Sequence, residues 1–193
     1  MLGMATRNYE GRKYESAKAQ NILDALTVEE ALQIDVNNKP FTVSMRTPGE
    51  DANLVRGLLH SEDIINDTNY SPELILKKEN EDGIVTIVNA TIPEDKIGGG
   101  YTNSRSLLSV SSCGICGKTE LGDLSFIGKT IDDKKKIDID LIHKLFDKMK
   151  RHQQDFKQSG GTHAAAAFNI DGKLLCTMED IGRHNAVDKV IGK

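Results

Sequence analysis

The sequence predicts a mixed α/β protein of the α+β kind. The 193-residue chain is expected to form two successive halves, each with strands and helices. Three observations lead to this prediction. Segments of alternating apolar and polar residues occur in the first half, helical periodicity dominates the second, and a run of glycines separates the two. Hydrophobic residues make up 38 % of the chain and charged residues 28 %, which is typical of a globular protein.

The first half is expected to be a small α+β domain over residues 26–100. Four of its segments have the composition of strands, namely 31–36, 41–46, 73–78 and 84–92. Turn-forming residues at 37–39 join the first two segments and predict a β-hairpin. The polar residues 1–25 are expected to form a flexible N-terminal extension.

A helix is predicted to follow the first hairpin. The sequence Thr-Pro-Gly-Glu at 47–50 has the pattern of a capping box, with proline at the first helical position. Apolar residues at helical spacing come next, at Leu54, Val55, Leu58 and Leu59. Three successive glycines at 98–100 predict a linker between this domain and a second domain over residues 101–193.

The second half contains one long predicted helix, a hairpin and a final helix. Asp138 is expected to cap the long helix, whose apolar positions run from Leu141 to Phe156 and which Gly160 ends. Residues 162–170 and 173–178 predict two strands joined by an Asp-Gly turn. An amphipathic helix then continues to Lys193, so we expect the natural protein to extend beyond that residue and this domain to be C-terminally incomplete.

Charge and hydropathy exclude several classes of protein. The chain has 25 basic and 29 acidic side chains and a net charge of −4, which argues against a nucleic-acid-binding protein. No apolar stretch approaches the ~20 residues that span a bilayer, so no membrane association is expected. The N-terminus has no secretory signal. A cytoplasmic location is therefore predicted.

Two of the three cysteines, Cys113 and Cys116, form a Cys-x-x-Cys pair flanked by serines and glycines. This pattern fits an accessible, reactive thiol that carries sulfur or takes part in thiol–disulfide exchange, with the second thiol as its resolving partner. A zinc site is an alternative, with Cys176 and His163 as the remaining ligands at an awkward spacing. A structural pair of buried thiols is the third possibility.

A second polar cluster comprises His163 and the segment 179–185. Gly182 permits a tight turn into a helix whose positive N-terminal end favours an anion, and Arg183 suits contact with phosphate or carboxylate. The alternative is a structural ion pair between Asp180 and Arg183, and His163 alone has the pattern of a buried histidine. Zinc deaminases need a glutamate two residues after such a histidine, where this chain has Ala165, so deaminase activity is not expected.

Taken together, these segments resemble the FdhD family, the sulfur carriers that formate dehydrogenase needs for activity. Four stretches carry the resemblance and follow the family's order: 45–50 (MRTPGE), 111–118 (SSCGICGK), 160–166 (GGTHAAA) and 179–192 (EDIGRHNAVDKVIG). They span most of the chain from about residue 29 onwards. The last stretch is long enough to be specific by itself.

The resemblance implies a cytoplasmic sulfurtransferase whose second domain is similar to the three-layer α/β/α fold of cytidine deaminases. In the family the first cysteine of the pair carries a persulfide, and this residue corresponds to Cys113. Sulfur would come from a cysteine desulfurase and pass to the molybdenum cofactor, bis-molybdopterin guanine dinucleotide, before the cofactor enters formate dehydrogenase. The cofactor would bind only transiently, and no resident cofactor or metal is expected.

Because that cofactor is polyanionic and the chain is acidic, a local positive site is expected at Arg183, His184 and His163. These side chains are predicted to face the same cavity as Cys113. Further cofactor-binding residues are expected beyond Lys193, and a homodimer is an expected assembly.

Overall fold

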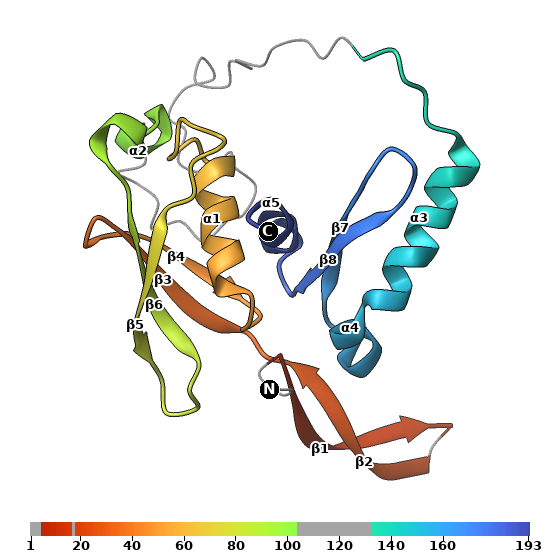
Figure 1. Ribbon diagram of the computed structural model, residues 1–193. Coiled ribbons are helices and arrows are strands. Elements are labelled where there is room, and N and C mark those ends of the chain that lie inside the picture. The colour runs from red at the N-terminus through yellow and green to blue at the C-terminus, as the bar shows by residue number, and fades with distance from the viewer. Residues whose placement is uncertain (1–4, 17, 104–132) are drawn as a thin grey trace.

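The computed structural model describes residues 5–16, 18–103 and 133–193 (Figure 1). The described elements, in chain order, are β1 (Thr6–Glu15), β2 (Lys18–Thr27), β3 (Glu30–Val36), β4 (Lys39–Arg46), α1 (Asp51–Ser61), β5 (Glu73–Glu79), β6 (Val85–Thr91), the 3₁₀ turn η1 (Glu94–Lys96), α2 (Gly99–Asn103), α3 (Ile139–His152), α4 (Gln154–Ser159), β7 (His163–Phe168), β8 (Leu174–Asp180) and α5 (Arg183–Ile191). This mixed content confirms the predicted α/β class. None of the described helices is long and apolar enough to cross a membrane.

The first half is built on a four-stranded sheet in the order β4-β3-β6-β5, in which only β3 and β6 run parallel. Apolar side chains from β3, β6 and one face of α1 form its core and are almost completely buried: Leu32, Ile34, Val36, Val88, Ala90, Leu54, Val55 and Leu59. The predicted hairpin and the two further strands are confirmed. The period-two alternation was therefore a reliable signal in this half, because one sheet face packs on a helix.

The predicted capping box is wrong. Helix α1 begins at Asp51, and Glu50 occupies the N-cap position in the left-handed conformation, φ 56°, with no side-chain cap. Thr47 is only 1 % exposed, and its hydroxyl accepts a hydrogen bond from the backbone N–H of Ile181 at 3.0 Å. The threonine hydroxyl thus binds a residue 134 positions away in the sequence and does not cap its own helix.

The N-terminal segment differs from the flexible extension expected over residues 1–25. Strands β1 and β2 pair antiparallel along their whole length, from the pair Thr6–Thr27 to the pair Glu15–Lys18. They form a separate two-stranded sheet. Nearly all of its side chains are exposed, so the sequence lacks the one-sided apolar pattern that usually indicates a strand.

The glycines at 98–100 pack closely against the turn that follows α1. The Gly98 N–H donates to Ile64 O at 2.8 Å and the Gly100 N–H to Asp63 O at 3.0 Å. A Cβ on Gly100 would lie 1.9 Å from Glu62 O, so only glycine fits there. These residues therefore belong structurally to the first half up to Asn103, and the proposed domain boundary near residue 100 stays a prediction.

In the second half, Asp138 caps α3 as predicted, because its carboxylate accepts from the Asp140 N–H at 2.8 Å. The long helix expected to reach Phe156 is broken at Gln153 into α3 and α4. The carboxylate of Glu179 accepts the N–H groups of Asp155 and Phe156 at 3.0 and 2.8 Å and so caps the start of α4 from the neighbouring strand. The β7–β8 hairpin and α5 are confirmed.

Helices α3 and α5 lie on opposite faces of the β7–β8 hairpin (Figure 1). This gives the described part of residues 101–193 a helix–hairpin–helix layering. Its similarity to the cytidine deaminase fold stays a prediction.

The two halves meet where α1 packs on α5 (Figure 1). Glycine allows the helices to approach closely: a Cβ on Gly57 would lie 1.8 Å from Asp188 O, and one on Gly192 would lie 2.0 Å from Asn53 O. Both contacts are with backbone atoms, which cannot rotate away as a flexible side chain can. The distance between the halves is therefore set by residues without side chains.

We expect Gly57→Ala to lower the free energy of unfolding by roughly 1–3 kcal/mol, because the added methyl forces α1 and α5 apart. Gly99→Ala is the matched control, since its Cβ would lie 3.6 Å from the nearest atom, a carboxylate oxygen of Asp63. Urea unfolding of both variants measures the difference. Equal stability of Gly57→Ala and the wild type would contradict the close helix contact.

Candidate functional site

The predicted catalytic residues Cys113 and Cys116 lie outside the described residues. Their geometry, and the predicted shared cavity with the arginine turn, therefore stay predictions. The residues predicted to bind the cofactor are described, and they lie at one end of the β7–β8 hairpin. That end is also where the two halves of the chain are connected by hydrogen bonds.

The hairpin register brings His163 next to the Arg183 turn. His163 begins β7 and is paired with Asp180, the last residue of β8. Two residues later, Gly182 is the N-cap of α5, so Arg183 and His184 occupy its first turn. The three predicted cofactor-binding residues are thus neighbours.

Within the described part of the chain, the side chains of these three residues form no hydrogen bond or ion pair. His163 and Arg183 are exposed, which contradicts the expectation that His163 is a satisfied buried histidine. His184 is partly buried, and its Nδ1 atom is inaccessible and has no hydrogen-bond partner among the described residues. An orphaned buried ring nitrogen of this kind is unusual in a folded protein.

The ion pair between Asp180 and Arg183, which was the alternative interpretation of this cluster, is not formed. The carboxylate of Asp180 instead lies 2.8 Å from Lys189 Nζ, with side-chain exposures of 0 and 3 %. Lys189 also donates to the carbonyl oxygens of Thr47 and Glu179 at 2.9 and 3.2 Å. All three ammonium protons therefore have an acceptor, which is the condition for burying a lysine in its charged form.

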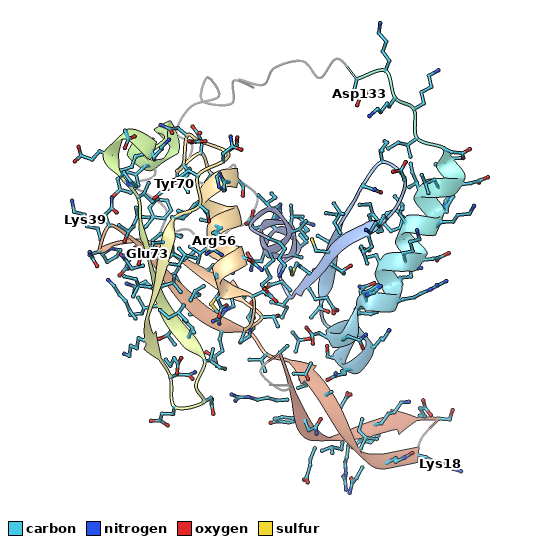
Figure 2. The ribbon with its side chains drawn as sticks, in the orientation of Figure 1. Lys18, Lys39, Arg56, Tyr70, Glu73 and Asp133 are labelled. Carbon is cyan, nitrogen blue, oxygen red and sulfur yellow. The ribbon has the colours of Figure 1, made fainter. Side chains whose placement is uncertain are left out.

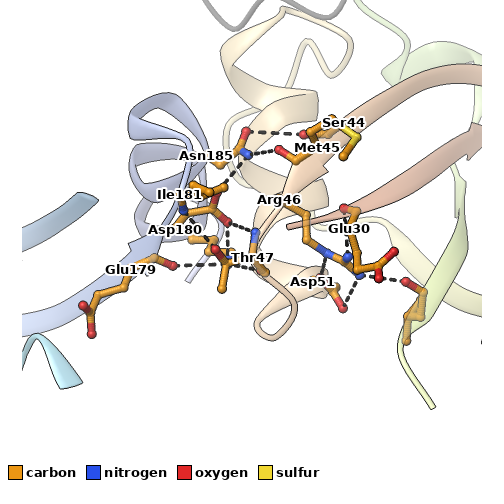
Figure 3. A network of polar contacts seen from close by, with 12 residues as sticks. Glu30, Ser44, Met45, Arg46, Thr47, Asp51, Glu179, Asp180, Ile181 and Asn185 are labelled. Carbon is orange, nitrogen blue, oxygen red and sulfur yellow. Dashed lines mark hydrogen bonds and ion pairs between the residues drawn. The ribbon is translucent and has the colours of Figure 1, made fainter. Parts of the chain in front are cut away.

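Asp180 is the centre of this network (Figure 3). One carboxylate oxygen accepts the Thr47 N–H at 3.1 Å, and the other accepts the Gly182 N–H at 2.8 Å and the Asn185 side-chain amide at 3.0 Å. The same amide donates to Met45 O at 2.8 Å. Asp180 and Asn185 thus connect the start of α5 to the end of β4.

A second buried cation lies next to Thr47. Arg46 has no exposed surface and contacts the Asp51 carboxylate through two nitrogens, at 2.7 and 3.3 Å (Figure 3). It also donates to the carbonyl oxygens of Glu30 and Val85 at 3.1 and 2.7 Å. Arg46 therefore holds the start of α1 against the sheet.

These contacts leave the N-terminal end of α5 positive and accessible. The first helical hydrogen bond joins the Ala186 N–H to Gly182 O, so the N–H groups of residues 183–185 precede the helical ladder. The charge of Asp180 is offset by Lys189 and does not oppose an incoming anion. The exposed guanidinium of Arg183 adds a full positive charge at the same place.

Sequence reasoning missed the role of Lys189. It predicted an amphipathic helix over this segment and assigned the lysine no role. Lys189 lies three residues after the fully buried Ala186, on the face of the helix that the structure buries. A lysine on a buried helical face requires a carboxylate partner, which was the signal available in the sequence.

Asp188 faces the other half of the protein across the contact between the helices. Burial raises its pKa to about 6, and the negative charge of Glu62 adds to this effect, while the Ser61 hydroxyl and His184 oppose it. The Ser61 oxygen lies 2.5 Å from Asp188 Oδ1 and 2.6 Å from Gly57 O. A hydroxyl has one proton, so Ser61 can donate to only one of these two oxygens at a time.

Comparisons with known proteins agree with this arrangement of motifs. The model of the FdhD/NarQ family matches residues 27–193. Sulfur carrier protein FdhD of Mycobacterium tuberculosis is 34 % identical over 200 residues, covering 99 % of this chain and 72 % of that protein. The proteins of the same name from Sulfolobus acidocaldarius and Thermoplasma acidophilum are 40 and 41 % identical, each over 88 % of this chain and 61 and 60 % of their own length. The chain thus spans between 60 and 72 % of these relatives.

A solved structure has the same fold. The crystal structure of a protein from Desulfotalea psychrophila, described as a formate dehydrogenase accessory protein, matches with a TM-score of 0.67 and 17 % sequence identity. The match covers 97 % of this chain and 67 % of that one. The described elements therefore have a fold that is found in an experimental structure.

We expect Asp180→Asn to lower the free energy of unfolding by about 3–5 kcal/mol, because it leaves Lys189 charged and buried without its counter-ion. Asp147→Asn, on the exposed face of α3, is the control and should stay within about 0.5 kcal/mol of the wild type. The double variant Asp180→Asn/Lys189→Met should regain part of the loss. A change of less than about 1 kcal/mol for Asp180→Asn, read by urea unfolding, would show that the pair does not hold the halves together.

The raised pKa of Asp188 predicts that the stability of the protein depends on pH. Its pKa of about 6 in the folded chain exceeds the ordinary value of 3.8, so between these values only the folded chain holds the proton. Stability therefore rises as the pH falls through 6 and is lost as the pH rises again. Asp188→Asn imitates the protonated side chain, so its stability advantage over the wild type should be present at about pH 8 and shrink towards pH 4, measured by thermal unfolding. A constant difference would contradict the raised pKa.

Proposed function

Because the chain belongs to the FdhD/NarQ family, we propose that it is a sulfur carrier protein that serves formate dehydrogenase. The main support is the family match over residues 27–193, which includes the Cys-x-x-Cys loop and the Arg183 turn. The curated relatives are named sulfur carrier proteins, and the structural neighbour is described as a formate dehydrogenase accessory protein. We place the protein in the cytoplasm and class it as a sulfurtransferase.

In the proposed reaction, the thiolate of Cys113 attacks the terminal sulfur of a persulfide held by a cysteine desulfurase. The sulfur–sulfur bond breaks, the desulfurase cysteine leaves as a thiolate, and Cys113 becomes the persulfide, with no net oxidation or reduction. The sulfur is then passed to a ligand position of the molybdenum cofactor, which is a substrate of the reaction. Glycine and serine neighbours in the sequence make the loop suited to such a reactive thiol.

Cys116 has two proposed roles. It can attack the sulfur bonded to the Cys113 side chain, which forms a disulfide and releases the outer sulfur as sulfide. In that step the two cysteines are oxidised and the outer sulfur is reduced, so the electrons balance. Alternatively, Cys116 only protects the neighbouring thiol from oxidation.

We propose that the acceptor cofactor, bis-molybdopterin guanine dinucleotide, places a phosphate or guanine group at the start of α5. Arg183 offers an exposed guanidinium, and the N–H groups of residues 183–185 precede the first helical hydrogen bond. His184, in the same first turn of α5, and the exposed ring of His163 provide further polar groups at the same end of the hairpin. These groups suit an anionic ligand, and the charge of the nearby Asp180 is offset by Lys189.

The alternative functions from the cysteine pattern are a zinc module and a thiol–disulfide oxidoreductase. The Cys₃His site that combined Cys176 with His163 is incompatible with the hairpin register. Cys176 is paired with Ala167, four residues from His163, so the two lie roughly 13 Å apart along the strands. Zinc would need both within about 2.3 Å of one ion. No group of three metal-ligating side chains occurs in the described part of the chain.

After incubation with a cysteine desulfurase and cysteine, we expect the protein to gain about 32 Da per accepted sulfur in a form that dithiothreitol removes. Cys113→Ala should lose the adduct and the ability to activate formate dehydrogenase, because it removes the accepting thiolate. Cys176→Ala, which changes the free half-buried thiol of β8, should keep both. Intact-protein mass spectrometry gives the result. An undiminished adduct on Cys113→Ala would move the accepting role to another cysteine.

We expect Arg183→Ala to weaken the binding of a guanine nucleotide, used as a stand-in for the end group of the cofactor, by roughly 10- to 150-fold. The reason is the loss of a charge-assisted hydrogen bond at the start of α5. Arg151→Ala, at the exposed end of α3, is the matched control for the loss of one positive charge. Isothermal titration calorimetry measures the nucleotide affinity of each variant. Equal affinities of the two variants would assign Arg183 no part in binding.

A further inference from the structure

The contact between α1 and α5 encloses a carboxyl group. Asp188, on α5, is partly buried, and its Oδ1 atom lies 2.5 Å from Ser61 Oγ at the end of α1. Among the described side chains, this is the one hydrogen bond that joins the two helices directly. The backbone of Asp188 lies against Gly57, where a Cβ would approach the Asp188 carbonyl oxygen to 1.8 Å. The carboxyl group therefore stays at the contact as long as the helices lie together.

The Ser61 hydroxyl is shared between two oxygen atoms. It lies 2.6 Å from Gly57 O as well as 2.5 Å from the Asp188 carboxyl group. When Asp188 is ionised, both neighbours are acceptors, and the single hydroxyl proton serves only one of them. When Asp188 is protonated, its own O–H can donate to Ser61 while Ser61 donates to Gly57 O. A proton on Asp188 therefore completes the hydrogen bonding of this contact.

The surroundings of Asp188 also favour its protonated form. The groups that act on its charge are Ser61 and Glu62 from the end of α1 and His184 from α5 itself. Within the described residues, β7 and β8, which also pack on α5, contribute none. Burial is the largest effect, and together with Glu62 it raises the pKa of Asp188 to about 6, while Ser61 and His184 oppose the rise. The closed contact thus holds a proton that an exposed aspartate loses at about pH 4.

A second connection between the halves lies at the start of α5. There the charges of Asp180 and Lys189 are paired with each other, and both side chains bond to the backbone of Thr47. The Asn185 side chain adds a hydrogen bond to Met45 O. None of these residues takes part in the contact between Ser61 and Asp188. The halves can therefore separate at α1 and α5 while they stay attached at the end of β4.

We propose that Asp188 is a proton-operated latch between the two halves of the chain. When Asp188 is protonated, α1 and α5 lie together. When it is ionised next to the negative charge of Glu62, the contact between the helices opens, and the network around Asp180 keeps the halves connected. Neither Ser61 nor Asp188 has a part in the proposed sulfur transfer, so a failure of the latch would leave the proposed function untouched.

The latch determines how the opening of the α1–α5 contact depends on pH. In the open form Asp188 is in water and has its ordinary pKa of 3.8, against about 6 in the closed form. Between these values the open form loses the proton and the closed form keeps it, so a rising pH favours opening. The equilibrium constant for opening should therefore increase by roughly 10- to 100-fold from about pH 4 to about pH 6 and be constant above.

Thiol labelling measures this opening. Asn53 is 8 % exposed and its backbone lies against α5, so Asn53→Cys introduces a thiol that is labelled when the contact opens. The variant is made in a chain whose three native cysteines are replaced by alanine. Its rate of labelling by 4,4′-dithiodipyridine is compared with that of an unprotected thiol at the same pH, which gives the equilibrium constant for opening. Val55→Cys, at a position in the core of the first half, is the matched control for global unfolding.

At pH 7 the thiol of Asn53→Cys should be labelled at least about tenfold faster than that of Val55→Cys, because the contact opens without global unfolding. Addition of Asp188→Asn should keep the labelling of Asn53→Cys slow at every pH, since the amide is uncharged and can still donate to Ser61. Equal labelling of Asn53→Cys and Val55→Cys would overturn the proposal. So would an opening constant that still depends on pH in the presence of Asp188→Asn.

Two further substitutions should move the pH dependence of opening in opposite directions. Ser61→Ala removes a hydroxyl that lowers the pKa of Asp188, so opening should level off at a higher pH. Glu62→Gln removes a negative charge that raises this pKa, so opening should level off at a lower pH. Glu73→Gln, at the start of β5 on the side of the sheet far from α5, is the control and should cause no shift (Figure 2). Shifts of Ser61→Ala and Glu62→Gln in the same direction, or no shift in either, would contradict the latch.

Discussion

Lys189 brings an ammonium group into the interior of the protein, where its side chain is 3 % exposed, and the carboxylate of Asp180 lies 2.8 Å away. Removing two charges from water is costly unless their remaining hydrogen bonds are satisfied. Two of the groups that satisfy them are the backbone N–H and C=O of Thr47, in the other half of the chain. The ion pair is therefore stable only when the end of β4 and the start of α5 lie together, and it fixes the relative position of the two halves.

This arrangement gives separate tasks to residues that are close in sequence. Within the stretch 179–192, Asp180, Asn185 and Lys189 point into the protein and are almost fully buried. Arg183 lies on the exposed side of the same turn. Much of this family motif is thus a scaffold, and the scaffold holds the positive end of α5 beside His163. The proposed ligand site depends on the buried network, because the network neutralises Asp180 and fixes the direction of the helix.

The sequence predicted those elements whose signals are local. The hairpin over residues 31–46 followed from alternation and turn residues, and the cap of α3 from Asp138, since each depends on neighbours in the chain. Long-range contacts changed the other assignments. Thr47 bonds to Ile181 and not to its own helix, and Asp180 pairs with Lys189 in place of Arg183. Strands β1 and β2 are exposed, so the sequence contains no one-sided apolar pattern that would predict them. The thiol pair lies outside the described residues.

The most direct test of the central claim is native-state hydrogen exchange of the amides that join the halves. The N–H groups of Thr47 and Ile181 donate to Asp180 and Thr47 across the contact, at 3.1 and 3.0 Å. If the buried network holds the halves as one cooperative unit, both amides should exchange with the same free energy as Ile34 in the core of β3. If both amides instead exchanged with a clearly lower free energy than Ile34, equal to that of the amides of α3, the halves would separate without global unfolding. That result would contradict the account.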